Sequence, residues 1–246
     1  MKTSKSGIMI GILCGLLTGC NSTHTPTESN ELSSVNSESL IFSESNSYTN
    51  SESLTKSSEE NETENQYISF NENIKLYINP SVQYTNPYAS NLGNEGQRMN
   101  EISLLLTQRI KEYTNIEVYA NNALPGLSLS NSVKESNQLK VNYHLALHSN
   151  AGGGIGSEGW YTQTSYSFAK SIIDSLQDVL PYPTRGLKNG EKTLYELKST
   201  YASACLIEIL FHDDVKQAQF LVTQQEKIAS AIYQGIIAYF IEKYNG

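Results

Sequence analysis

Cysteine, positive charge and long apolar runs are all scarce in this sequence of 246 residues. Cys14 and Cys20 lie near the N-terminus, so Cys205 is the one cysteine of the remaining chain, and an intrachain disulfide within that part is excluded. Lys and Arg number 17 against 25 Asp and Glu. Without a basic patch, the sequence predicts no nucleic-acid partner. The apolar run from Ile8 to Leu17 is too short for a membrane-spanning helix.

That short run is typical of a secretory signal instead. Lys2 and Lys5 precede it, and it ends in Leu17-Thr18-Gly19-Cys20. This ending resembles a bacterial lipobox, which implies that residues 1–19 are removed and that Cys20 is lipidated as the mature N-terminus. Two or three acyl chains would anchor the protein stably, so we expect an extracytoplasmic lipoprotein attached to the cell membrane. The alternative is an ordinary signal peptide with a chance cysteine.

Residues 20–70 are predicted to be a disordered linker. Ser, Asn, Glu and Thr fill 36 of positions 21–70, and nine Glu against Lys56 give a net charge of −8. Such a segment cannot bury enough apolar surface to offset its chain entropy. Residues 71–246 carry 14 basic and 16 acidic residues, a net charge of −2. The overall charge of −8 therefore belongs to the linker and not to a functional surface.

Residues 71–246 have the length of one domain, and their apolar pattern alternates between periods of two and 3.6 residues. The period of two or a continuous apolar run predicts strands at 74–79, 116–120, 141–147, 159–161 and 204–210. The period of 3.6 predicts helices at 96–113, 165–180 and 224–244. This alternation predicts a single α/β domain with a mostly parallel central sheet flanked by helices.

One histidine and two glutamates stand beside apolar runs of this domain. His148 ends the run His144-Leu-Ala-Leu-His148 and precedes a glycine-rich turn, which is how a buried strand presents a side chain at a sheet edge. Glu95 lies upstream, and Glu208 interrupts Leu206-Ile207-Glu208-Ile209. A carboxylate in such a run is unfavourable unless it is paired or functional. Imidazole is the commonest neutral metal ligand, so the set suggests a hydrolytic zinc site.

An ordered set of short motifs between residues 74 and 240 resembles the zinc-dependent N-acetylmuramoyl-L-alanine amidases of the amidase-3 family. The motifs are Asn79-Pro80-Ser81-Val82-Gln83, Asn86-Pro87-Tyr88, Asn94-Glu95-Gly96, His148-Ser149-Asn150-Ala151, Glu158-Gly159, Arg185-Gly186-Leu187-Lys188, Leu194-Tyr195-Glu196-Leu197 and Leu206-Ile207-Glu208-Ile209-Leu210-Phe211. The resemblance implies that Glu95 and His148 are zinc ligands and that Glu208 is the catalytic base. It also implies that peptidoglycan is the substrate, cleaved between N-acetylmuramic acid and L-alanine.

The chain departs from the family at the first zinc ligand. The family usually has a Pro-Gly-His-Gly turn after its first strand, whereas this chain has Pro80-Ser81-Val82-Gln83, typical of a divergent branch. Gln83 can ligate through its amide oxygen, although zinc prefers nitrogen and sulfur donors. His212, four residues after Glu208, is the competing ligand. His144 lies about 13 Å deeper along its strand than His148, at ~3.3 Å per residue, and is not expected to reach the same ion.

Two further residues are predicted to contact the substrate. Arg185 either holds a substrate carboxylate or pairs with a neighbouring acid, and Asn150 lies two residues beyond His148. The missing histidine also leaves a second function open, namely an inactive peptidoglycan-binding or regulatory lipoprotein with an amidase fold. The intact Glu208 favours the enzyme, because a binding module has no need of a buried carboxylate.

Overall fold

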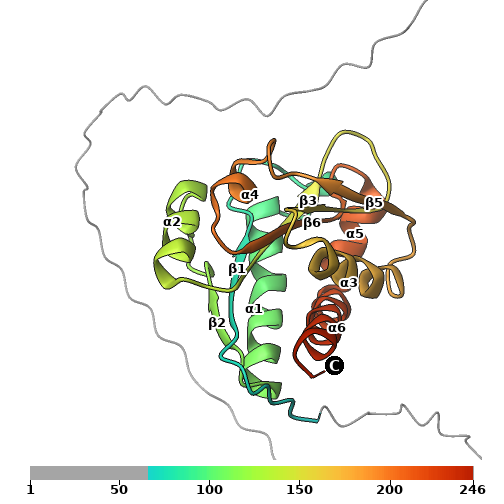
Figure 1. The fold of residues 1–246 in the computed structure, drawn as a ribbon. Helices are drawn as coiled ribbons and strands as arrows, with labels where there is room; N and C mark the ends of the chain where they lie inside the picture. The colour runs from blue at the N-terminus through green and yellow to red at the C-terminus, as the bar shows by residue number, and fades with distance from the viewer. Residues whose placement is uncertain (1–65, 246) are drawn as a thin grey trace, which may run out of the picture. The chain divides into compact units, whose positions relative to one another are not determined.

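A six-stranded sheet forms the centre of the part of the chain that the computed structural model describes, residues 66–245 (Figure 1). Its strands are β1 (Lys75–Pro80), β2 (Glu117–Ala120), β3 (Tyr143–Asn150), β4 (Ser157–Tyr161), β5 (Thr184–Asn189) and β6 (Ser203–Phe211). Their order across the sheet is β2-β1-β3-β6-β4-β5. The strands β2, β1, β3 and β6 are mutually parallel, and β4 and β5 run the opposite way. The prediction of a single α/β domain with a mostly parallel sheet is confirmed.

Three long helices cover one face of the sheet, as Figure 1 shows. They are α1 (Glu95–Tyr113), α3 (Tyr166–Gln177) and α6 (Gln225–Tyr244). Each places apolar side chains at helical spacing against the strands, and together with β1, β3 and β6 they enclose the main hydrophobic core. The α1 helix begins where the side chain of Asn94 accepts a hydrogen bond from the backbone N–H of Gln97. These helices coincide with the predicted ones, except that α3 ends at Gln177, three residues earlier than expected.

The opposite face carries two helices that the sequence pattern did not predict, α2 (Leu129–Leu139) and α4 (Tyr195–Ser199). Side chains alternate between the faces of a strand, so His144 and His148 of β3 lie on the same face. His144 contacts Ser136 of α2 and Glu196 of α4 through hydrogen bonds. The helices α2 and α4 therefore lie on the face of the sheet that also carries His148. A small apolar cluster (Ala146, Leu197, Ala204 and Leu206) fills the space beneath them.

The short elements complete the fold around one edge of the sheet. A 3-10 helix, η1 (Ala89–Asn91), precedes α1, and α5 (Val215–Thr223) follows β6. The parallel strands β1, β3 and β6 all end at this edge, whereas α1 and β4 begin there. The fold thus brings together the segments that contain residues 81–86, 95, 148–158 and 208–213.

The packed part of the chain begins before residue 71, the domain start that the sequence suggested. Phe70 is buried, and its ring packs edge-on against Phe240 with centroids 6.0 Å apart. Ile68 donates a backbone hydrogen bond to Tyr113. The predicted signal peptide, Cys20 and most of the predicted linker lie outside the described residues. Among residues 66–245, no helix is long and apolar enough to cross a membrane.

Candidate active site

Three side chains predicted to bind a metal meet at the carboxyl edge of the parallel strands. Gln83 follows β1, His148 lies near the end of β3, and Glu95 is the first residue of α1. His148 Nδ1 is 2.9 Å from Glu95 Oε1. Gln83 Nε2 is 3.4 Å from the same carboxylate oxygen and 3.4 Å from His148 Nδ1. Three segments far apart in the sequence thus place three polar groups within hydrogen-bonding distance of one another.

Asn86 determines which way the Gln83 amide faces. Its Nδ2 donates to Gln83 Oε1 at 2.9 Å and to Glu95 Oε2 at 2.9 Å. A carboxylate accepts hydrogen bonds only, so the Asn86 side chain must present its NH₂ group to Glu95. The oxygen of Gln83 therefore faces Asn86, and its NH₂ group faces His148 and Glu95. For the amide oxygen to bind a metal here, the Gln83 side-chain amide has to rotate so that its oxygen and its NH₂ group exchange positions.

His148 and Glu95 form an ion pair. Burial by itself would lower the pKa of His148, but the hydrogen bond and negative charge of Glu95 outweigh it and raise the pKa to about 9. Burial likewise acts to raise the pKa of Glu95, and the hydrogen bond and charge of His148, with the hydrogen bond from Asn86, lower it. Each group thus stabilises the charged form of the other.

Glu208 lies beside this pair and has the properties of a proton-transfer group. It is the register partner of His148 across β3 and β6, so both side chains leave the same face of the sheet. Its Oε2 atom is buried, and no described residue offers it a hydrogen bond. Burial raises the pKa of Glu208 to about 7, against the positive charge of His148 and aided by the negative charges of Glu95 and Glu158. A carboxyl group with such a pKa can both accept and release a proton near neutral pH.

The donor set fits a zinc ion with one adjustment. A tetrahedral ion with bonds of about 2.0–2.1 Å holds its ligand atoms roughly 3.3–3.4 Å apart, close to the separations of 2.9–3.4 Å found here. Histidine and glutamate are ordinary zinc ligands, and Gln83 could offer its oxygen if its amide rotated to exchange the positions of its oxygen and its NH₂ group. Residues 66–245 contain no group of three or more His, Cys, Asp or Glu placed to hold a metal ion. A zinc site therefore depends on Gln83 as the third protein donor.

A second charged group lies next to Glu208. Glu158 of β4 stands directly opposite Glu208 in the antiparallel pairing of β4 with β6. Like charges placed opposite each other are unfavourable. Here Arg185 Nε and Lys188 Nζ of β5 both contact Glu158 Oε2, at 3.0 and 2.6 Å. Burial acts to raise the pKa of Glu158, and these two cations lower it instead, so Glu158 stays charged beside Glu208.

The two predicted substrate-binding residues both lie near this cluster. Arg185 pairs with Glu158, which is the neighbouring acid foreseen as an alternative, and its guanidinium carbon lies 5.2 Å from the centre of the Phe211 ring. Its side chain remains 41% exposed, so it can reach a ligand as well. Asn150 ends β3, where its Oδ1 accepts a hydrogen bond from the backbone of Ala151.

The other two histidines of the domain do not join the cluster. Ser149 alternates with His148 along β3, and His212 Nδ1 lies 3.0 Å from Ser149 Oγ. The His212 ring is buried, stacked on Tyr88 with centroids 5.1 Å apart. It lies on the side of the sheet opposite His148. His144 is held by α2 and α4, as expected for a residue deeper in the strand.

Asn86, Glu158 and Lys188 contribute to the site, although no role for them was predicted from the sequence. All three lie within motifs that carry the resemblance. The motifs thus include these positions, but the contacts of the three side chains depend on how loops and neighbouring strands meet in space. A neighbouring apolar run or glycine-rich turn identifies a strand end, whereas nothing in the local sequence indicates which carboxylate a given amide will face.

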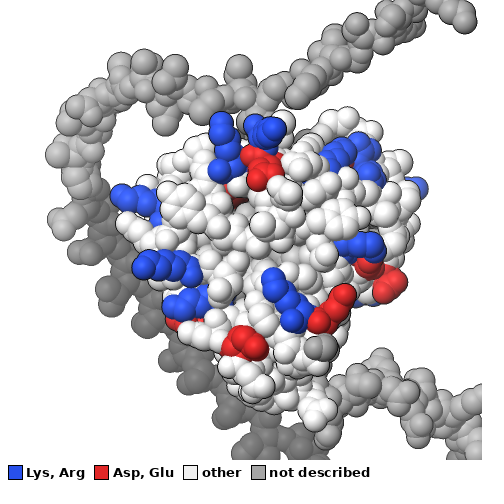
Figure 2. All heavy atoms as spheres, viewed as in Figure 1, with Lys and Arg blue, Asp and Glu red and all other residues white. Residues whose placement is uncertain are grey.

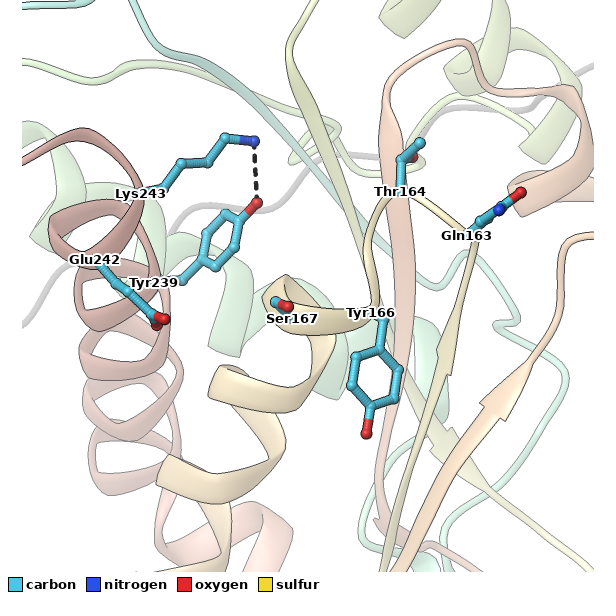
Figure 3. Close-up of a pocket in the computed structure, with 7 residues that line it drawn as sticks. All are labelled: Gln163, Thr164, Tyr166, Ser167, Tyr239, Glu242 and Lys243. Atoms are coloured by element: carbon cyan, nitrogen blue, oxygen red, sulfur yellow. Dashed lines mark hydrogen bonds between the residues drawn. The ribbon is translucent and has the colours of Figure 1, made fainter. Parts of the chain in front are cut away.

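A separate polar pocket of about 340 Å³ lies between α3 and α6 (Figure 3). In Figure 3, Tyr239 and Lys243 of α6 lie on one side, and Lys243 Nζ donates to the Tyr239 hydroxyl at 3.2 Å. Gln163 and Thr164 lie on the other side. None of the predicted site residues lines this pocket. Figure 2 shows basic and acidic side chains spread over the visible face without merging into a patch of one sign.

Comparison with known sequences identifies one family. The family model described as N-acetylmuramoyl-L-alanine amidase (amidase-3) matches residues 77–238. A germination-specific N-acetylmuramoyl-L-alanine amidase of Bacillus subtilis (strain 168) is 31% identical over 126 residues, which cover 47% of this chain and 52% of the relative. The amidase LytC of the same strain is 30% identical over 166 residues, covering 61% and 32%. The match thus spans about half of one relative and a third of the other.

Solved structures of similar fold are amidase catalytic domains. The catalytic domain of CwlV from Bacillus (Paenibacillus) polymyxa var. colistinus superposes with a TM-score of 0.63 at 21% identity, covering 68% of this chain and 98% of that one. AmiC2 of Nostoc punctiforme gives a TM-score of 0.62 at 16% identity, covering 68% and 97%. The CwlD amidase from Clostridioides difficile, solved in complex with the GerS lipoprotein, gives 0.56 at 20%, covering 68% and 98%. At these identities the likeness concerns the fold.

Proposed function

We propose that this chain, which belongs to the amidase-3 family, is a peptidoglycan hydrolase. Its reaction is hydrolysis of the amide between the lactyl group of N-acetylmuramic acid and L-alanine of the stem peptide. The observation that carries the proposal is Glu208, whose buried Oε2 has no hydrogen-bond partner among the described residues and faces the same side of the sheet as His148. A carboxylate oxygen that is buried without a partner, beside a cluster of metal-binding type, is unfavourable unless the group is used.

Zinc is the cofactor that this cluster would hold, through Gln83, Glu95 and His148. When bound, zinc supplies Lewis acidity, which lowers the pKa of water from about 15.7 toward about 7 and polarises a carbonyl. Glu95 brings one negative charge to the set, whereas Gln83 and a deprotonated His148 bring none. The combined charge of the ion and its ligands would therefore stay positive and favour an oxyanion.

Glu208 performs the proton transfers in this proposal. It accepts a proton from the attacking water as the carbon–oxygen bond forms, and it then delivers that proton to the amide nitrogen as the carbon–nitrogen bond breaks. The products are the lactyl carboxylate and the free amine of L-alanine. Its pKa of about 7 suits both steps, because the group is neither too weak a base nor too weak an acid near neutral pH.

Arg185 and Asn150 are proposed to position the substrate. Arg185 is partly exposed and stands two strands from Glu208, close enough to hold a carboxylate of the stem peptide. Asn150 lies at the end of β3, two residues past His148, where its amide can bind a peptide group. We also propose that Cys20 anchors the protein to the outer side of the cell membrane, which would place the domain next to its polymer.

The test is release of L-alanine N-termini from purified peptidoglycan by the zinc-loaded protein. We expect release by the unchanged chain and a loss of about 10²–10⁴-fold for Glu208→Gln, the typical worth of a general acid–base group. Circular dichroism and zinc content should stay unchanged in that variant, because Gln preserves the shape of the side chain.

Glu72→Gln is the matched control, since it removes an exposed carboxylate far from the cluster in sequence. Activity of Glu208→Gln within a few-fold of the unchanged chain would contradict the role of Glu208. Absence of release by the unchanged chain, with binding to peptidoglycan retained, would favour the inactive binding or regulatory lipoprotein.

A further inference from the structure

A surface groove of about 380 Å³ lies between α2 and α4. Its lining combines aromatic rings with hydroxyl, amide and ammonium groups: Ser130, Val133, Lys134, Asn137, Gln138, Tyr195, Ser199 and Tyr201. Tyr195 is 52% exposed and Tyr201 is 89% exposed, the highest value for any large apolar side chain of the described residues. Two tyrosines that share one groove and bury so little of their rings are available to a ligand.

The groove is held rigidly. The side chain of Asn137 on α2 donates to the backbone oxygen of Ser199 at 2.9 Å and accepts from the backbone N–H of Tyr201 at 2.8 Å. It thereby fixes the turn that carries Tyr201 to α2. Below the groove, His144 joins Ser136 of α2 to Glu196 of α4. A ligand would therefore meet an organised surface and would not have to order it first.

The groove and the candidate active site share one face of the sheet. Ala204 and Glu208 lie four residues apart on β6 and point to the same face, and α4 packs on that face near Ala204. Ser203 follows the groove residue Tyr201 by two positions and begins β6. The distance from Ser203 to Glu208 along this strand is about 17 Å at ~3.3 Å per residue. A polymer that runs across this face can occupy both places at once.

We propose that the groove between α2 and α4 binds the glycan strand of peptidoglycan at a distance from the scissile amide. This inference rests on the proposed function for the identity of the polymer. A sugar ring has an apolar face that stacks on tyrosine and a rim of hydroxyl and acetamido groups that pair with amide and hydroxyl side chains. Lys134 is the one charged residue of the lining, so the groove suits a polymer recognised mainly by neutral groups.

The experiment measures binding of the tetramer of β-1,4-linked N-acetylglucosamine to the full-length protein by isothermal titration. We expect Tyr201→Ala to weaken binding roughly tenfold, as for loss of a central aromatic contact, and Tyr201→Trp to retain or strengthen it. Tyr67→Ala is the matched control, because Tyr67 is 56% exposed and lies outside the groove. Its dissociation constant should equal that of the unchanged chain.

A second measurement separates this inference from the proposed function. Tyr201→Ala should lower kcat/KM on polymeric peptidoglycan while leaving it unchanged on a soluble muramyl tripeptide that cannot reach the groove. Equal tetramer binding by Tyr201→Ala and the unchanged chain, or no binding at millimolar tetramer, would overturn the inference. Tyrosine-dependent tetramer binding by a protein that releases no L-alanine would support the glycan site and contradict the proposed amidase activity.

Discussion

The orientation of one amide decides how this chain can hold a metal. Asn86 turns the oxygen of Gln83 away from His148 and Glu95, so metal binding has to break the hydrogen bond between Asn86 and Gln83. A histidine at position 83 would need no such turn and would offer the nitrogen donor that zinc prefers. The site of this chain is therefore expected to bind zinc more weakly than the same site with three ordinary ligands.

Substitution of Gln83 tests this expectation. Gln83→His should tighten zinc binding by at least roughly tenfold, because imidazole replaces an amide oxygen, and Gln83→Ala should weaken it, because two protein donors remain. Zinc affinity is measured by competition with a chelator of known affinity. His212→Ala is the informative comparison, because the His212 ring is stacked on Tyr88 on the other side of the sheet. This variant should have a lower melting temperature and an unchanged zinc affinity. A large loss of zinc in His212→Ala with little change in Gln83→Ala would reverse the assignment.

Single residues were predictable from the sequence where an apolar run isolates a polar one. Glu208 stands between Ile207 and Ile209, and His148 lies near the end of a buried strand, so both could be recognised without a structure. The orientation of Gln83 could not, because it depends on Asn86, which lies in a loop with no periodic pattern. The same holds for Glu158, whose importance comes from its position opposite Glu208.

At the scale of elements, the sequence predicted those that bury many apolar side chains. The helices α1, α3 and α6 have apolar residues at helical spacing, and the strand β6 is a nearly continuous apolar run. In contrast, the buried residues of α2 are two serines and one valine, and β5 is an edge strand that contains Arg, Gly and Lys. Such segments are ordered by polar contacts with distant residues, and no local periodicity reports those contacts.

The polar contacts that attach α2 and α4 to the sheet should have a measurable effect on stability. Burial acts to raise the pKa of Glu196, but its hydrogen bond with His144 and their electrostatic attraction lower it. Asn79 also donates to this carboxylate. Glu196→Gln should therefore lower the free energy of unfolding at pH 7 by about 1.5–3 kcal/mol, the usual worth of hydrogen bonds to a charged group.

The loss of stability in Glu196→Gln should depend on pH, and the direction of this dependence follows from the lowered pKa of Glu196. A carboxyl group with a lowered folded-state pKa contributes stability that is fully present above its unfolded pKa of about 4.3 and is lost as the pH falls through the folded value. The difference between the unchanged chain and Glu196→Gln should thus shrink as the pH falls from about 5 toward 3. Urea unfolding at several pH values measures it. A difference that stays constant down to pH 3 would show that the charge of Glu196 is not involved.

At the scale of the whole molecule, Cys20 is predicted to determine where the protein resides. A lipidated cysteine with two or three acyl chains should hold the chain in the membrane fraction, and Cys20→Ala should release it. Mass spectrometry of the extracted protein should find acylated Cys20 at the N-terminus. Cys14→Ala is the control, because Cys14 lies within the segment expected to be removed. Retention of Met1 with an unmodified Cys20 would contradict the prediction.

The start of the folded domain sets how much of the chain can be removed without loss of stability. Phe70 fills a position in the core against Phe240, and Asn115 exchanges two hydrogen bonds with its backbone, at 2.9 and 2.7 Å. A chain that begins at residue 71 loses these contacts, whereas one that begins at residue 66 keeps them. Full burial of a phenylalanine side chain is worth about 1.5–3 kcal/mol, and the hydrogen bonds add about 0.5–1.5 kcal/mol each.

We therefore expect the chain of residues 71–246 to melt roughly 5–25 °C below the chain of residues 66–246, at ~2–4 °C per kcal/mol for a domain of this size. Differential scanning calorimetry of the two chains measures the difference. Phe70→Ala in the longer chain is the matched variant. It should reproduce the part of the loss that comes from the ring, because it removes the ring and keeps the backbone pairing with Asn115. Equal melting temperatures for the two chains would place the domain start after Phe70, where the polar composition of the preceding segment had suggested it.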